Sequence, residues 1–118
     1  MAVRIKRIYD PVEEADGWRA LVDRVWPRGI SKDNAHLDEW LRELAPTGDL
    51  RKWFHHDPDL WDEFRRRYRA ELSRPEQQAI LVGLRRRAKE GPVTLLFGAR
   101  DALHNQAVVL AEELQREH

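Results

Sequence analysis

The chain contains no cysteine, and this absence excludes several kinds of chemistry. Disulfide bonds, thiolate nucleophiles and thiolate metal sites all need that residue. Cysteine usage therefore gives no redox compartment, although its absence is compatible with the cytosol. Long apolar runs are missing too, because residues 1–7 alternate apolar and basic side chains and lack the apolar core of a signal peptide or membrane span. We expect a soluble, cytoplasmic protein with no membrane partner.

A net charge is also missing, because 21 Lys and Arg residues balance 21 Asp and Glu residues. This balance argues against a protein whose main work is to coat nucleic acid or an anionic membrane. Apolar material for a core is present, since 42% of the 118 residues are hydrophobic and five are Trp. A chain of this length and composition has room for one packed domain, so we expect a single α/β domain over residues 1–118.

Three β-type stretches predict three strands of one small sheet. Residues 3–9 alternate imperfectly between apolar and basic side chains, residues 18–26 are rich in Val and Leu, and residues 93–97 carry no charge, as in a central strand. The link between the first two is short, so they form either a wide hairpin or a parallel pair with an abbreviated crossover. Helical segments around the strands predict a mainly parallel sheet flanked by helices, a minimal Rossmann-like or flavodoxin-like fold.

Helical periodicity and capping residues fill the rest of the chain. Apolar side chains at positions 37, 40, 41 and 44 predict an amphipathic helix that ends before Pro46. Thr47, Asp57 and a capping box at Ser73 mark three further helix starts, and residues 107–114 predict a last helix. The apolar stripes of these helices predict that Trp40, Trp53 and Trp61 are mostly buried. They also predict that the arginine-rich run at residues 65–69 is mostly exposed.

Charged side chains at the ends of two predicted strands mark the candidate functional site. Asp23 and Arg24 lie in an apolar run that normally excludes charge, because burying an unpaired ion is costly. The ligand crevice of a parallel α/β sheet lies beyond the carboxyl ends of the strands, so this cluster should meet the loop that follows residue 97. The candidate residues are Asp23, Arg24, Trp26, Arg28, Lys32, Arg100, Asp101, His104 and Asn105.

This cluster suits a small anionic or phosphate-bearing ligand. Arg24 and Arg28 supply forked donors that match carboxylate or phosphate, and Trp26 forms a wall. Asp23 and His104 are the candidates for acid–base catalysis. In the structural alternative, Asp23 pairs with an arginine to hold the sheet edge, while the polar residues after position 100 serve only as loop and cap residues.

Two other motifs are weaker signals, one for a metal site and one for nucleic-acid binding. The triplet at 55–57, His-His-Asp, lacks the i, i+4 spacing of a helical zinc motif, so we expect no metal, and the sequence predicts no cofactor. The basic helices over residues 58–90 are compatible with a nucleic-acid-associated or regulatory module without turnover. Acidic residues precede the first arginine run at i, i+4, which indicates a largely solvated face and weak binding. The sequence predicts no particular oligomeric state.

Several segments of the chain form a recognisable set of motifs: Arg7–Pro11, Leu21–Ile30, Trp40–Pro46, Arg51–Phe54, His56–Pro58, Phe64–Tyr68 and Val93–Phe97, followed by Asp101 and His104–Asn105. These segments resemble the short, YeaO-like branch of the domain-of-unknown-function 488 family. The string Asp-Arg-x-Trp-Pro-Arg-Gly is the most specific of them, and the match covers essentially the whole chain. The resemblance implies a small α/β domain without an established activity. Longer relatives carry a Cys-His-Arg step where this chain has His104-Asn105-Gln106, so thiol chemistry is not carried over.

Overall fold

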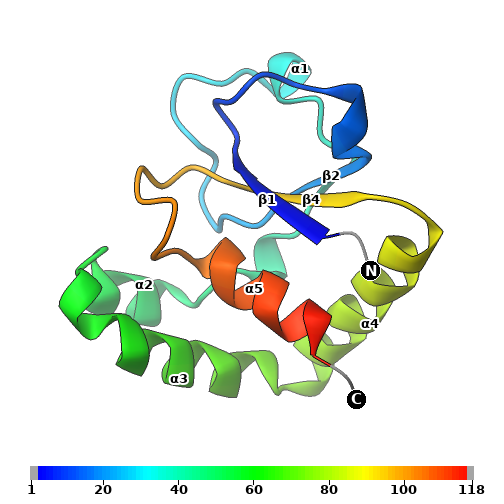
Figure 1. Ribbon diagram of the computed structural model, residues 1–118. Helices are drawn as coiled ribbons and strands as arrows, with labels where there is room; N and C mark the ends of the chain where they lie inside the picture. Colours follow the sequence, from blue (N-terminus) through cyan, green and yellow to red (C-terminus); the bar gives the residue numbers. More distant parts are fainter. Residues whose placement is uncertain (1–2, 117–118) are drawn as a thin grey trace.

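The computed structural model describes residues 3–116 and contains one sheet with most of its helices on one side (Figure 1). The strands are β1 (Val3–Arg7), β2 (Trp18–Leu21), β3 (Glu39–Trp40) and β4 (Val93–Phe97). The helices are α1 (Lys32–Ala35), α2 (Gly48–Phe54), α3 (Trp61–Leu72), α4 (Pro75–Glu90) and α5 (Gln106–Gln115). Short 3-10 turns are η1 (Glu14–Asp16), η2 (Arg42–Leu44) and η3 (Pro58–Leu60).

The sheet has the strand order β1-β4-β2-β3, and all neighbouring strands are parallel. The predicted α/β class with a parallel sheet is therefore confirmed. The predicted number of three strands is wrong, because β3 adds a fourth at one edge. The order also differs from the Rossmann and flavodoxin orders, in which the first strand is an inner one. Here β1 is an edge strand, as its half-apolar sequence indicates.

The first two strands do not pair with each other, because β4 runs between them. Ile5 of β1 and Ala20 of β2 both lie opposite Leu95. The short connection is thus a parallel crossover and not a hairpin. It ends at Gly17, which has a φ of 64° and where an added Cβ would lie 2.3 Å from the carbonyl oxygen of Pro92. Only glycine fits this turn without strain.

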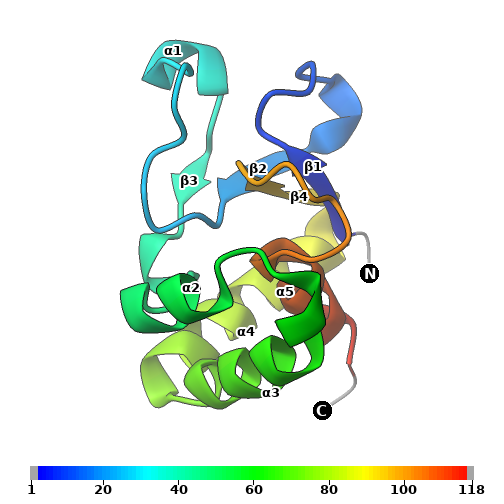
Figure 2. The same ribbon diagram turned by 90° about the vertical axis from the view of Figure 1, so that its left-hand side faces the viewer.

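Two apolar cores cover the two faces of the sheet. Ala20 and Leu95 belong to the larger core under the long helices, whereas the next residues along each strand, Leu21 and Leu96, belong to a smaller core near α1. This is the alternation that strands impose on side chains. Figure 2 shows α2 to α5 on one side of the sheet and α1 on the other. All of β4 is buried, which confirms its expected central place.

Residues 37–44 do not form the predicted amphipathic helix. Part of this segment is strand β3, and the Leu41 backbone N–H donates to a β2 carbonyl oxygen at 2.8 Å. The apolar residues of this segment have the spacing of a helix because some of them face one core and some face the other. Leu37 and Trp40 pack on the smaller core, and Leu41 and Leu44 belong to the larger one.

The other predicted helices are present, although one cap differs. Thr47 and Asp57 each accept a backbone N–H at the start of α2 and η3, and η3 leads directly into α3. The predicted capping box at Ser73 is not formed. The Ser73 hydroxyl instead donates to the Ala70 carbonyl oxygen at 2.6 Å, and α4 begins after Arg74 without a side-chain cap.

The arginine run on α3 is only partly solvated. Arg66 and Arg67 are exposed and pair with Glu63 at i−3 and i−4. Arg65 and Arg69 are half-buried, and both pair with a glutamate of α5. The expectation of a mostly exposed run is therefore wrong for these two, because sequence periodicity does not indicate that α5 packs beside α3.

The tryptophans predicted to be mostly buried are only half-buried, although they pack against the two cores as the apolar stripes indicate: Trp40, Trp53 and Trp61. Their indole rings therefore support the helices and β3. None of the helices within residues 3–116 has the length and apolarity needed to cross a membrane.

Candidate functional site

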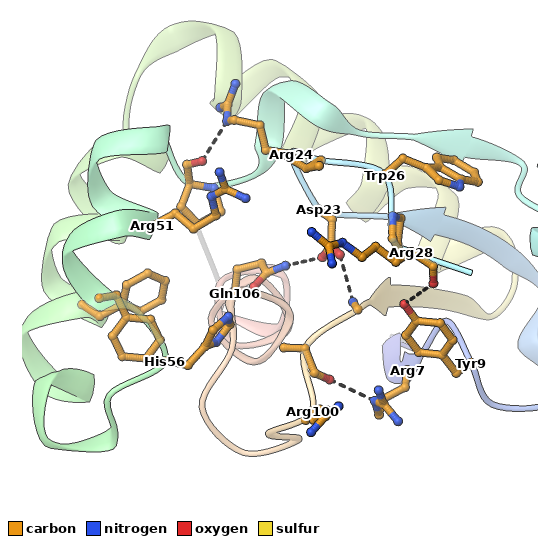
Figure 3. A pocket seen from close by; sticks show the side chains of 17 residues that line it. Arg7, Tyr9, Asp23, Arg24, Trp26, Arg28, Arg51, His56, Arg100 and Gln106 are labelled. Atoms are coloured by element: carbon orange, nitrogen blue, oxygen red, sulfur yellow. Dashed lines mark hydrogen bonds between the residues drawn. The ribbon is translucent and has the colours of Figure 1, made fainter. Parts of the chain in front are cut away.

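A cavity of about 530 Å³ opens at the edge of the sheet where the strands end (Figure 3). Segments that follow β1, β2 and β4 form one side of it, and α2 with the first turns of α3 forms the other. This is the edge at which parallel α/β sheets bind ligands. The volume falls within the range of roughly 300–1,000 Å³ found for small-molecule sites.

Asp23 lies between the two sides of the cavity, just beyond the end of β2. One of its carboxylate oxygens accepts the Gly98 backbone N–H at 2.9 Å, and the other accepts the Gln106 side-chain N–H at 2.5 Å. Burial raises the pKa of Asp23 to about 6, against the opposing effects of these hydrogen bonds and of the Arg51 charge. The carboxyl group therefore changes its charge close to neutral pH.

The absence of a side chain at Gly98 leaves room for the Asp23 carboxylate. An added Cβ at Gly98 would lie 2.8 Å from the Asp23 carboxylate and 3.4 Å from the Cβ of Pro27. Real side chains do not approach so closely, so a residue larger than glycine would displace the carboxylate. The glycine that directly follows β4 thus sets the floor of the cavity.

Arg24 and Trp26 line the cavity, but the fold uses their polar groups. Arg24 donates from Nε to the Pro46 carbonyl oxygen at 2.8 Å and from Nη2 to that of Ala45 at 3.1 Å. The Trp26 indole N–H donates to the Ile30 carbonyl oxygen at 2.8 Å. Arg24 therefore braces the segment before α2, and it does not present the open fork that the sequence predicted.

Four other arginines bring unpaired guanidinium groups to the cavity. Arg7 donates from Nε to the Ala99 carbonyl oxygen at 2.9 Å, which leaves its terminal nitrogens free of partners among residues 3–116. Arg28, Arg51 and Arg100 are exposed, and their side chains form no hydrogen bond or ion pair with that part of the chain. Free guanidinium forks are the groups best suited to bind carboxylate or phosphate.

The cavity is strongly positive within a chain of zero formal charge. Five arginines line it, and among the described residues the only carboxylate that does so is Asp23. Charges of one sign gathered in a concave site with apolar walls raise the local concentration of the opposite ion. Phe54 and Phe64 supply apolar walls.

Four sequence candidates do not line the cavity: Lys32, Asp101, His104 and Asn105. Lys32 is exposed on α1. His104 contacts Asp101 through Nδ1 at 2.9 Å and packs its ring edge-on against Trp61. Asn105 is buried and caps α5 by accepting two backbone N–H groups. This cap and the Asp101 carboxylate fold the loop back on itself, so Asp23 and His104 do not meet as an acid–base pair.

The sequence analysis did not select five polar residues that line the cavity: Arg7, Tyr9, Arg51, His56 and Gln106. Arg7 ends β1 and Tyr9 follows it, so the strand-end argument that selected Asp23 would have selected both. Gln106 begins α5 and was passed over in favour of its neighbours. Arg51 and His56 come from α2 and its C-terminal turn, which meet the sheet only through tertiary packing.

The lining residues favour binding of an anion over bond-making chemistry. Within the described part of the chain no Ser, Thr or Cys faces the cavity, and the Tyr9 hydroxyl donates to the Arg28 carbonyl oxygen at 2.7 Å. Residues 3–116 also contain no group of three or more His, Asp or Glu side chains placed to hold a metal ion. Anion recognition by arginine needs none of these groups.

Comparison with known proteins identifies close relatives. The chain is 46% identical over 115 residues to the uncharacterised protein YeaO of Escherichia coli K12, covering 98% of each chain. It is 40% identical over 112 residues to the uncharacterised protein Rv3073c of Mycobacterium tuberculosis H37Rv, covering 95% of this chain and 92% of that one. No solved structure matches the chain significantly.

The match at the level of protein families is equally extensive. Residues 2–118 match the family described as "Inactive DUF488-N3 subclade". The relatives extend along the same length of sequence, so the match is not confined to one motif. The chain therefore belongs to the YeaO-like DUF488 family.

Proposed function

We propose that the cavity binds a small anionic ligand, of the carboxylate or phosphate type, without turning it over. The observation that carries this proposal is the set of unpaired guanidinium groups of Arg7, Arg28, Arg51 and Arg100 around one apolar-walled cavity. Four unpaired cations in one cavity repel one another, and a bound anion relieves that repulsion. This gives the anion a binding free energy that a scattered set of surface arginines does not supply.

The state of the carboxylate supports binding without catalysis. The two oxygens of Asp23 accept hydrogen bonds from Gly98 and from Gln106, and these bonds weaken the carboxylate as a nucleophile. The other acid–base candidate, His104, faces Trp61 outside the cavity. The description of the matching subclade as inactive supports the same reading.

The nucleic-acid alternative has weaker support. Most arginines of α3 are paired with glutamates, and on α4 Arg85 donates to the Glu113 carbonyl oxygen while Arg87 stacks on Trp18 at 3.5 Å. These groups cannot bind phosphates without giving up contacts they already have. The four cavity arginines with unpaired guanidinium groups carry no such cost.

Thermal unfolding tests the proposal directly. Phosphate, sulfate and small carboxylates, added at constant ionic strength, should raise the Tm of the parent protein by mass action. Arg51→Ala should remove most of that shift and leave the Tm without anion nearly unchanged, because this exposed side chain makes no contact that the fold needs. Arg74→Ala, an exposed arginine outside the cavity, is the matched control and should behave as the parent. Equal shifts in all three proteins would refute the proposal.

A further inference from the structure

The basic side chains of the cavity lie on two walls that belong to different parts of the fold. Arg7 ends β1, and Arg28 and Arg100 come from the segments that follow β2 and β4 at the sheet edge. Arg51 and His56 come from α2 and the turn after it. Figure 3 shows the α2 pair on one side of Asp23 and Arg7 on the other. The cavity therefore has two basic regions with a carboxylate between them.

The sheet wall holds its arginine in a fixed position. The Nε hydrogen bond to the Ala99 carbonyl oxygen orients the guanidinium of Arg7, and the Tyr9 ring lies 4.9 Å from it. A stacked, oriented guanidinium loses little conformational freedom when an anion binds. The next basic side chain along the edge is Arg100, two residues beyond Gly98.

The α2 wall presents its histidine through an unusual backbone conformation. His55 and His56 are consecutive residues in the left-handed region, with φ values of 45° and 55°. That region is disfavoured for residues with a Cβ, and such strain tends to occur where a side chain must face a site. The first residue caps α2, and the second lines the cavity beside Arg51.

The carboxylate between the walls determines what can occupy the centre of the cavity. Asp23 repels an anionic group placed directly over it and attracts a hydrogen-bond donor. Each of its oxygens has accepted only one hydrogen bond and retains room for another. A single small anion also leaves much of a cavity of about 530 Å³ unfilled.

We propose that the cavity recognises a dianion, whose two anionic groups bind the opposite walls and whose neutral centre lies over Asp23. This inference rests on the proposed anion-binding function and names its ligand class. Each wall alone offers a weak site for a single anionic group. A linker of the right length makes the second contact intramolecular, so the two contacts together bind far more tightly than either.

Calorimetric titration with two series of probes tests the dianion. The probes are the α,ω-dicarboxylates from malonate to adipate, the α,ω-alkane bisphosphonates, and a monoanion matched to each, all at pH 8 and constant ionic strength. Affinity should pass through a maximum at one chain length and exceed that of the matched monoanion at least tenfold. Arg51→Ala and Arg100→Ala should each reduce the affinity for the best dianion to about the monoanion level. The double variant, which lacks an arginine on both walls, should bind it more weakly still.

The two histidines of the turn provide a matched pair of variants. His56→Ala should weaken the best dianion several-fold, whereas His55→Ala should not, because only His56 lines the cavity. Dianions of every length that bind no tighter than monoanions, with monoanion binding still dependent on Arg51, would overturn the inference and leave the proposed function standing. No binding of any probe would overturn both.

Discussion

Asp23 contributes a carboxylate to a cavity that is also lined by five arginines. Asp23 is half-buried without a direct ion pair and has a pKa of about 6, which means that its ionised form is poorly solvated in the folded protein. A group whose folded pKa lies above its unfolded value favours the folded state below that pKa and loses the contribution as pH rises through it. At neutral pH the ionised Asp23 therefore lowers the free energy of unfolding.

Replacing Asp23 with Asn should stabilise the protein at neutral and alkaline pH. A pKa raised from 3.8 to about 6 corresponds to about 3 kcal/mol at most, since each unit is worth about 1.4 kcal/mol. Rearrangement of the Gln106 amide, which must then face an amide, lowers the expected gain to roughly 1–2 kcal/mol. Urea unfolding of both proteins between pH 4 and pH 8 should show the difference growing from pH 4 to pH 7. A constant loss of stability at every pH would contradict this account.

A second prediction at this scale concerns the glycine beside that carboxylate. Gly98→Ala should lower the free energy of unfolding by roughly 1–3 kcal/mol, because its Cβ would lie 2.8 Å from the Asp23 carboxylate. Gly83→Ala is the matched control. That glycine lies inside α4 with open space around it, so alanine there should stabilise the protein by about 0.5–1 kcal/mol. Denaturant midpoints of the two variants should therefore move in opposite directions.

At the scale of elements, the sequence predicts helices better than it predicts strand ends. The starts of α2 and η3 have caps that act locally, and β4 is recognisable because it has no charge. The segment 37–44 was misread because its apolar residues face two different cores, which imitates helical spacing. The predicted strand 18–26 stops at residue 21, since the chain turns away to form the cavity. Tertiary packing decides both cases.

The difference between local sequence signals and tertiary packing also explains which site residues could be predicted. Asp23, Arg24, Trp26, Arg28 and Arg100 follow strands at one sheet edge, and the strand-end argument selects such residues without knowledge of the packing. Arg51 lies on α2 and His56 in the turn after it, and tertiary packing alone brings these two residues to that edge. The loop 101–105 was included because of its position in the sequence, but its own hydrogen bonds turn it away.

The link between β2 and α2 gives a prediction at this scale. Arg24 joins the two elements through the carbonyl oxygens of Ala45 and Pro46, which are both buried. Arg24→Ala should lower the free energy of unfolding by about 2 kcal/mol, because it leaves those acceptors without a partner. Arg28→Ala, which removes an exposed arginine of the same loop, should leave it nearly unchanged. Equal losses in the two variants would mean that Arg24 does not brace this link.

At the scale of the whole molecule, zero formal charge conceals an uneven distribution. Five arginines surround the cavity, and elsewhere bases meet acids closely, as around the buried Asp16, which contacts Arg4, Lys6 and Arg19. The field of the protein is therefore concentrated at one concave site. A nucleic-acid binder would instead need an extended row of unpaired cations.

This distribution predicts weak binding to nucleic acids. Short single-stranded DNA and RNA should bind with a Kd above about 100 μM at physiological salt. This affinity is lower than that of typical non-specific nucleic-acid binders. Arg66→Glu and Arg86→Glu, both on exposed helix positions, should leave the Tm shift produced by phosphate unchanged, since neither residue lines the cavity. Fluorescence anisotropy across a salt series measures the nucleic-acid binding, and thermal melts measure the Tm shift. Micromolar binding that falls steeply with salt and is lost in Arg86→Glu would place the function on the basic helices, because only contacts with phosphates there produce that combination.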